Sequence, residues 1–143
     1  MQTKMLIGGE LVAGEGAATP VLDPATGKEV ASVNEASPAQ IEAACAAAGE
    51  AFESFGQTTP AERSAMLLAI ADAIEAHNDE LAELESLDCG KPFAAARDDE
   101  MPLTIDTFRF MAGAARTQGG SAAGEYVEGQ TSMIRKDPIG PVA

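Results

Sequence analysis

The hydrophobic residues of the chain follow two different periods, and the first covers residues 5–35. Apolar residues there form short runs between Gly, Pro and Asp, a pattern typical of strands joined by turns. The runs are Met5–Ile7, Glu10–Val12, Pro20–Leu22 and Glu29–Val33. Asp23-Pro24 followed by Gly27 favours a turn between the last two, because Pro presets φ and Gly accepts a positive φ. We predict an antiparallel strand arm with a tight reversal.

From Ser37 onward the period becomes helical. Ser37-Pro38-Ala39-Gln40 offers an N-cap hydroxyl, a proline at the first helical position and a Gln that can reach back. Apolar residues then recur on one face of a helix, at Ile41, Ala44, Cys45, Ala48, Phe52 and Phe55. Thr59-Pro60-Ala61-Glu62 repeats the cap and precedes a second apolar stripe. Two helices are predicted here.

Two further helices are predicted before the strand pattern returns. The third starts at Asn78 and ends at Gly90 and Pro92, since both residues stop helices. The fourth runs from about Pro102 to Arg116 and is apolar around most of its circumference, which predicts a buried helix. Its apolar residues are Leu103, Ile105, Phe108, Phe110, Met111, Ala112 and Ala115. Glycines follow, and strands are expected again at Tyr126–Val127 and Thr131–Arg135.

The last residues suggest an unfinished sheet. A basic strand leads into a turn at Pro138–Gly140, and a second apolar strand is expected to begin there. A strand that nothing covers is typical of one piece of a larger fold. We therefore expect this chain to be a segment of a larger protein.

The composition predicts a hydrophobic core with few large side chains. The chain has 143 residues and is 45% hydrophobic, but it contains no Trp, one Tyr and five Phe, and alanine is abundant. Burial stabilises in proportion to apolar area, and alanine offers little of it. The core is expected to depend on neighbouring polypeptide.

The formal net charge of -14 excludes nucleic acid as a partner, because phosphate binding needs clustered Lys and Arg. It also disfavours an anionic membrane surface. No signal peptide or membrane-spanning run is present, and two cysteines without metal-ligand spacing indicate a reducing compartment. We predict a cytoplasmic protein.

Few side chains are candidates for catalysis or ligand binding. Cys45 lies within an apolar stripe and is predicted to be an inert buried thiol. Cys89 lies beside Lys91, which could lower its pKa, but no base follows at a recognisable spacing, so packing is favoured. His77 is expected at a helix end, and Asp98–Glu100 at a solvated helix N-terminus instead of a cation site. No glycine pair opens a phosphate loop. The residues alone define no catalytic set.

The order of several motifs resembles the N-terminal part of the aldehyde dehydrogenase superfamily. The motifs are Ile7–Val12, Asp23–Gly27, Thr59–Arg63, Glu83–Ser86, Gly90–Pro92, Phe108–Gly113 and Arg135–Gly140. Within that family the chain looks most like bacterial γ-aminobutyraldehyde dehydrogenases, with betaine aldehyde dehydrogenases close by. The segments that point to this subgroup are Gly56–Pro60, Ala122–Tyr126 and Gly129–Arg135.

The resemblance implies an α/β fold and NAD-dependent oxidation of a small aminoaldehyde, as in putrescine degradation, to its carboxylate. In the family's order the Pro-Trp-Asn segment, the base glutamate and the nucleophilic cysteine all come later. Neither Cys45 nor Cys89 matches that nucleophile, and the chain has no Trp. The resemblance thus implies no catalytic and no NAD-binding residue here, and an inactive segment.

The resemblance also implies a division of the chain. Residues 1–36 correspond to a strand arm, 37–118 to the helical part of the nucleotide-binding domain, and 119–143 to oligomerisation strands and the start of the nucleotide-binding sheet. A homo-oligomer, dimer or tetramer, is expected. Some family members hold a monovalent cation, and the matching positions are the Val21 carbonyl and the Glu100 carboxylate.

Two alternatives stay open. The chain could be a complete small thiol enzyme that depends on Cys89. It could also be a non-catalytic interaction module, in which the strand arm pairs with the sheets of a partner.

Overall fold

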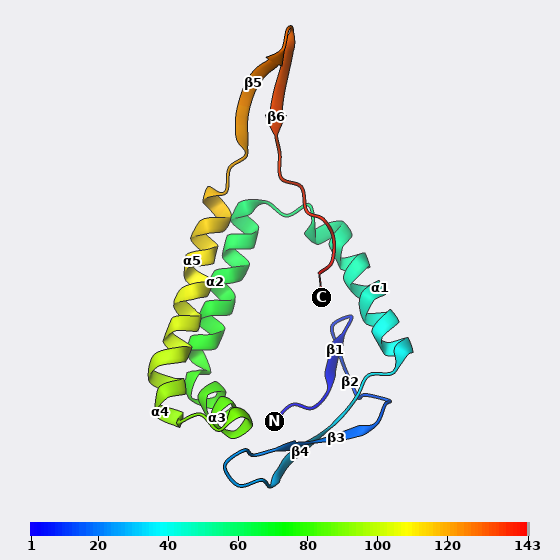
Figure 1. Ribbon diagram of the computed structural model, residues 1–143, viewed down its shortest axis with the longest axis vertical. Coiled ribbons are helices and arrows are strands. Elements are labelled where there is room, and N and C mark those ends of the chain that lie inside the picture. Colours follow the sequence, from blue (N-terminus) through cyan, green and yellow to red (C-terminus); the bar gives the residue numbers. More distant parts are fainter. Residues whose placement is uncertain (143) are drawn as a thin grey trace.

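The computed structural model describes residues 1–142, apart from the side chains of residues 121–123. Two strand hairpins precede a set of helices, and a third hairpin follows them (Figure 1). The order is β1 (Met5–Ile7), β2 (Glu10–Val12), β3 (Ala18–Leu22), β4 (Glu29–Asn34), α1 (Pro38–Phe55), α2 (Pro60–Ala76), α3 (Asn78–Cys89), α4 (Phe93–Ala95), the π-helix η1 (Ala96–Glu100), α5 (Met101–Thr117), β5 (Ser121–Val127) and β6 (Gln130–Ile134).

Each pair of consecutive strands forms its own antiparallel two-stranded sheet. In the β3–β4 hairpin Ala18 pairs with Asn34. Its turn is built by Asp23, whose carboxylate accepts from the backbone N–H of Ala25 at 2.8 Å and from the Thr26 hydroxyl at 2.7 Å. Gly27 completes the turn with φ of 69°. The predicted arm and its reversal are confirmed.

Both predicted capping boxes are present. The Ser37 hydroxyl accepts from the Gln40 backbone N–H at 3.3 Å, and the Gln40 side-chain oxygen accepts from the Ser37 N–H at 3.0 Å. At the start of α2, Thr59 and Glu62 make the same pair of bonds at 3.3 and 2.7 Å. These residues satisfy N–H groups that a helix start otherwise leaves without partners.

Helices α2 and α5 lie side by side and hold most of the small core (Figure 1). The buried apolar residues are Ala71, Ala82, Ala96, Ile105 and Ala112. At the surface of this pair, the Arg109 guanidinium lies 3.2 Å from the Asp72 carboxylate and 2.6 Å from that of Glu75. Small side chains let the two helices approach closely, but they bury little apolar area.

The molecule exposes far more surface than a compact chain of its mass. Its accessible area is 10310 Å², whereas a folded monomer of this mass exposes about 6,900 Å². Figure 1 shows why: α1 and the α2–α5 pair stand apart, and the β5–β6 hairpin projects beyond the helices. Large apolar side chains such as Leu103 and Phe110 remain 67% and 69% exposed.

The prediction of a buried fourth helix is therefore wrong for the described residues. One side of α5 packs on α2, and no element of residues 1–142 covers the other apolar side. Sequence periodicity reports that a face is apolar, but not which polypeptide covers it.

Three further details differ from the predictions. The acidic run Asp98–Glu100 belongs to the π-helix η1, not to a helix N-terminus, and the short helix α4 before it was missed. Residues 135–142 form no strand, although one was expected there. No helix among the described residues is long and apolar enough to cross a membrane.

Candidate functional site

A cluster of charged side chains joins the end of α3 to η1. The Lys91 ammonium lies 2.8 Å from the Glu85 carboxylate on α3 and also contacts the carboxylate of Glu100, the last residue of η1. The predicted cation position Glu100 is thus part of a three-residue cluster. Glu85 was not predicted, because nothing in the sequence shows which carboxylates the Lys91 side chain will reach.

The end of α3 positions the backbone of Lys91. Gly90 ends the helix in the left-handed region with φ of 73°, and its N–H donates to the Ser86 carbonyl at 3.0 Å. The Ser86 hydroxyl in turn donates to the Lys91 carbonyl at 2.6 Å. A Cβ at position 90 would lie 2.8 Å from Cγ of Pro24. Only glycine suits this position, because it tolerates both the φ and the close neighbour.

The Lys91 ammonium and the Glu85 carboxylate each favour the charged form of the other. Hydrogen bonds from the Lys91 ammonium to Glu100 and Glu85 raise the lysine's pKa, and the bond from Lys91 lowers the pKa of Glu85. The Lys91 side chain is 29% exposed, so water screens part of the attraction. Ionic bridges of this kind fix geometry more than they stabilise the fold.

Both cysteines are exposed, and the surroundings of Cys89 disfavour its thiolate form. Cys89 is exposed and its Sγ lies 3.0 Å from the Glu85 carbonyl and 3.2 Å from the Glu85 carboxylate. The hydrogen bond to Glu85 raises the thiol's pKa and outweighs the opposite effect of Lys91. The predicted packing role of Cys89 is therefore wrong. Cys45 was predicted to be buried and is also exposed, because nothing described covers its side of α1.

A hollow of about 650 Å³ borders the cluster. Its wall is mostly apolar, with Val21 from β3 and Leu84 from α3 among its residues, and Glu85 and Asp88 are the acidic residues on it. The register of the β3–β4 hairpin shifts immediately after Val21. Such a bulge leaves a residue out of the strand pairing. The structure thus places Val21 and Glu85 around one hollow, and Met101, which follows Glu100, lies on the same wall.

Carbonyl and carboxylate oxygens suit a hard monovalent or divalent cation. However, the Glu100 carboxylate is engaged by Lys91, and the residues described include no group of three or more His, Cys, Asp or Glu side chains that could hold a metal ion. The monovalent cation at Val21 and Glu100 stays a prediction.

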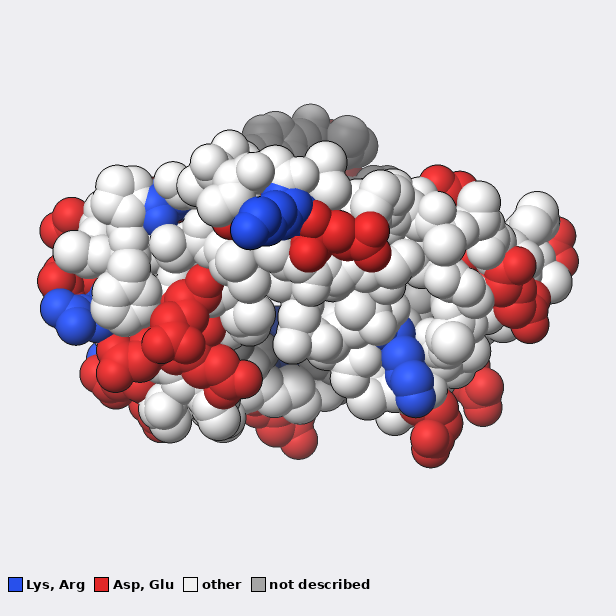
Figure 2. Space-filling model, turned by 90° about the horizontal axis from the view of Figure 1, so that it is seen from below, with Lys and Arg blue, Asp and Glu red and all other residues white. Residues whose placement is uncertain are grey.

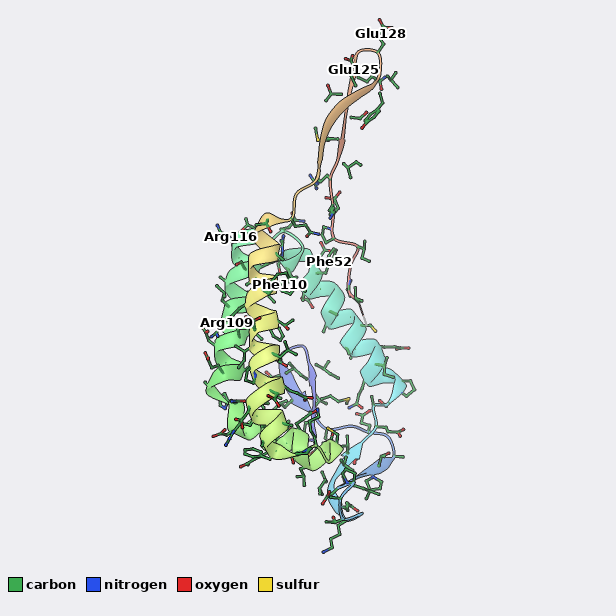
Figure 3. All side chains as sticks on the ribbon, turned by 60° about the vertical axis from the view of Figure 1, so that its left-hand side comes forward. Phe52, Arg109, Phe110, Arg116, Glu125 and Glu128 are labelled. Carbon is green, nitrogen blue, oxygen red and sulfur yellow. The ribbon has the colours of Figure 1, made fainter. Side chains whose placement is uncertain are left out.

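The remaining candidate residues lie apart from this cluster. His77 links α2 and α3, is exposed and lies 3.1 Å from Glu80, in line with the predicted position at a helix end. Phe110 points away from the side of α5 on which Arg109 meets α2 (Figure 3). On the face in Figure 2, acidic side chains gather in several places and basic ones stand separately. That face offers no continuous basic surface.

Residues 11–143 match the family model described as "Aldehyde dehydrogenase family". The chain belongs to this family. It is 37% identical over 144 residues to a mitochondrial aldehyde dehydrogenase of Leishmania tarentolae, covering 98% of this chain and 28% of the relative. It is 43% identical over 100 residues to a betaine aldehyde dehydrogenase of Cereibacter sphaeroides, covering 70% of this chain and 21% of the relative.

Solved structures of aldehyde dehydrogenases share the fold. A betaine aldehyde dehydrogenase variant from Staphylococcus aureus in complex with NAD+ superimposes with a TM-score of 0.88 at 31% identity, over 96% of this chain and 28% of that one. An NAD-dependent benzaldehyde dehydrogenase from Corynebacterium glutamicum gives 0.85 at 27% identity, over 93% and 29%. The predicted α/β aldehyde dehydrogenase fold, present in part, is confirmed. The chain spans about 28% of the length of such proteins.

Proposed function

We propose that this chain forms part of the structural framework of an NAD-dependent aldehyde dehydrogenase. The overall reaction converts an aldehyde, NAD+ and water to a carboxylate, NADH and two protons. The family match over residues 11–143 carries this proposal. The NAD+ complex of the Staphylococcus aureus relative supports the choice of cofactor.

The proposed substrate is a small aminoaldehyde resembling γ-aminobutyraldehyde. Support comes from the amino-acid sequence of three segments, which resembles that of γ-aminobutyraldehyde dehydrogenases: Gly56–Pro60, Ala122–Tyr126 and Gly129–Arg135. The identity to a betaine aldehyde dehydrogenase is consistent with it, since that relative's name denotes an aldehyde with a nearby cationic nitrogen.

The proposed role of the chain itself is support. Residues 1–36 would serve as a strand arm, 37–118 as the helical layer of the nucleotide-binding domain, and 119–143 as oligomerisation strands in a cytoplasmic homo-oligomer. Tyr126 on β5 is 83% exposed, and Met133 and Ile134 on β6 are exposed as well. Such side chains favour a hairpin that packs on another subunit.

Steady-state kinetics with the purified protein that contains this chain tests the proposal. We expect NADH formation with NAD+, and a kcat/KM for γ-aminobutyraldehyde above that for acetaldehyde. The 143-residue chain alone should form no NADH and retain no NAD+. Activity of the homogeneous 143-residue chain that Cys89→Ser abolishes would instead favour the thiol-enzyme alternative.

The second candidate function is an interaction module, predicted from the strand arm of residues 1–36, to which we add the β5–β6 hairpin. The β5–β6 hairpin projects from the helices, with Glu125 and Glu128 near its tip, so its edges are open to another sheet (Figure 3). Size-exclusion chromatography of the chain with a full-length relative tests this candidate. Separate elution would remove it.

A further inference from the structure

We propose that the apolar side of α1 is a docking surface for the part of an aldehyde dehydrogenase chain that lies outside the 28% matched by this chain, and that the two polypeptides associate without a covalent link. The residues of this apolar side are Ile41, Cys45, Ala48, Phe52 and Phe55. The proposal rests on the function proposed above and adds to it the surface and its partner.

Helix α1 has one apolar side and one acidic side. The apolar residues recur at helical spacing, whereas Glu42, Glu50 and Glu53 lie on the opposite side. Ile41 and Phe55, at the two ends of the apolar side, are 54% and 52% exposed. An apolar stripe on a helix normally faces a core. This one is open to water in the described part of the chain.

The described neighbours of α1 leave its apolar side open. The turn between β1 and β2 approaches the helix at Ala47, outside the apolar side, where a Cβ added to Gly8 would lie 3.9 Å from the Ala47 Cβ. At the end of the helix, Phe52 and Phe55 line a hollow of about 400 Å³ together with Pro138. Helix α1 also stands apart from the α2–α5 pair (Figure 1). Covering the apolar side thus requires further polypeptide.

The superposition on solved structures supports the choice of that polypeptide. This chain has the shape of a segment of the Staphylococcus aureus betaine aldehyde dehydrogenase variant, over 96% of its residues, yet the segment makes up 28% of that protein. Elements of a folded chain bury their apolar sides against one another, so the remaining part of such a protein is the natural cover for the segment.

The exposed area is large enough for such a partner. It exceeds that of a compact chain of this mass by about 3,400 Å², whereas each partner in a standard protein interface buries about 800 Å². A second copy bound along the β5–β6 hairpin would leave α1 uncovered, because the hairpin projects beyond the helices (Figure 1). The area therefore favours the remaining part of the enzyme over a second copy.

Co-production of two polypeptides tests the docking. The chain is produced together with the tagged remaining part of the Staphylococcus aureus enzyme, and the amount of chain retained with the tag is measured. Ala48→Arg places a charge in the middle of the apolar side. Ala46→Arg is the matched control, because Ala46 is also exposed on α1 but lies on the acidic side, four residues from Glu42 and from Glu50.

We expect the unaltered chain and Ala46→Arg to form an equimolar complex with the remaining part. Ala48→Arg should lower the retained amount about tenfold or more, because docking would bury a charge without a partner. Both positions are exposed and arginine is a good helix former, so circular dichroism should show unchanged helix content in both variants. Equal retention of the two variants would overturn the proposal, as would elution of the unaltered chain only as a monomer or as a dimer of itself.

A single-chain chimaera separates this proposal from the proposed function. It joins the chain to the remaining part of the Staphylococcus aureus enzyme by a peptide bond, and NADH formation from betaine aldehyde and NAD+ is measured. An active chimaera whose two parts do not associate when produced as separate chains would overturn the docking and leave the proposed function intact. An inactive chimaera, beside a complex that Ala48→Arg disrupts, would support the docking and contradict the proposed function.

Discussion

The side-chain amide of Gln40 donates to the carbonyl of Ala13 at 2.8 Å, and this bond ties the N-terminal arm to the first helix. The Gln40 side-chain oxygen also accepts from the N–H groups of Glu15 and Ser37, at 3.1 and 3.0 Å. Gln40 is 7% exposed, although glutamine is mostly a surface residue. One side chain thus serves both the helix cap and the arm.

Gln40→Ala should detach the arm from α1. It leaves three backbone groups without their partners, and we expect unfolding free energy to fall by about 1–3 kcal/mol. Urea unfolding measures the loss, and faster amide hydrogen exchange at Glu15 would locate it. Gln57→Ala is the control, since Gln57 is exposed and its side chain makes no hydrogen bond in the described structure. Equal losses in both variants would contradict the assignment.

Removing the N-cap hydroxyl of α2 should lower the stability of the chain more than removing a hydroxyl from inside a helix. Thr59→Ala removes the cap of α2 and should cost about 1 kcal/mol of stability. Thr107→Ala removes a hydroxyl that donates to the Leu103 carbonyl at 2.8 Å inside α5. Alanine is the better helix former there, so we expect no loss. Helix content followed by circular dichroism during thermal unfolding checks both variants.

Two glycine-to-alanine substitutions should change the stability of the chain in opposite directions. Gly90→Ala places a Cβ against Pro24 at a positive φ and should destabilise by about 1–2 kcal/mol or more. Gly113 lies inside α5, and a Cβ added there would meet no atom within 4 Å beyond the helix's own backbone. Gly113→Ala should therefore stabilise by about 0.5–1 kcal/mol. Denaturant midpoints at unchanged slope test the pair, and a stabilising Gly90→Ala would refute the strain argument.

Acid should weaken the β3–β4 turn. Hydrogen bonds from Thr26 and Ala25 lower the pKa of Asp23 in the folded chain. Its contribution to stability is fully present above the unfolded pKa of about 3.9 and is lost as pH falls through the lower folded value. Asp23→Asn can keep the bond to the Ala25 N–H but does not ionise. We expect its unfolding midpoint to fall less than that of the unaltered chain below about pH 4. Parallel curves for the two proteins would contradict this.

Sequence alone determined the local elements of this protein. Ser37 with Gln40, Thr59 with Glu62, and Gly90 act within a few residues of themselves, so their spacing is enough to predict a helix start or end. The hairpin turn at Asp23 is local in the same sense. The motifs that identified the family are likewise readable in order along the chain.

Tertiary structure alone decided how distant residues meet. Lys91 with Glu100, Arg109 with Asp72, and Gln40 with Ala13 are brought together by the paths of helices and hairpins, which no spacing rule encodes. The exposure of α5 was missed for the same physical reason. Periodicity measures which residues would gain from leaving water, whereas burial depends on the surface that is packed against them.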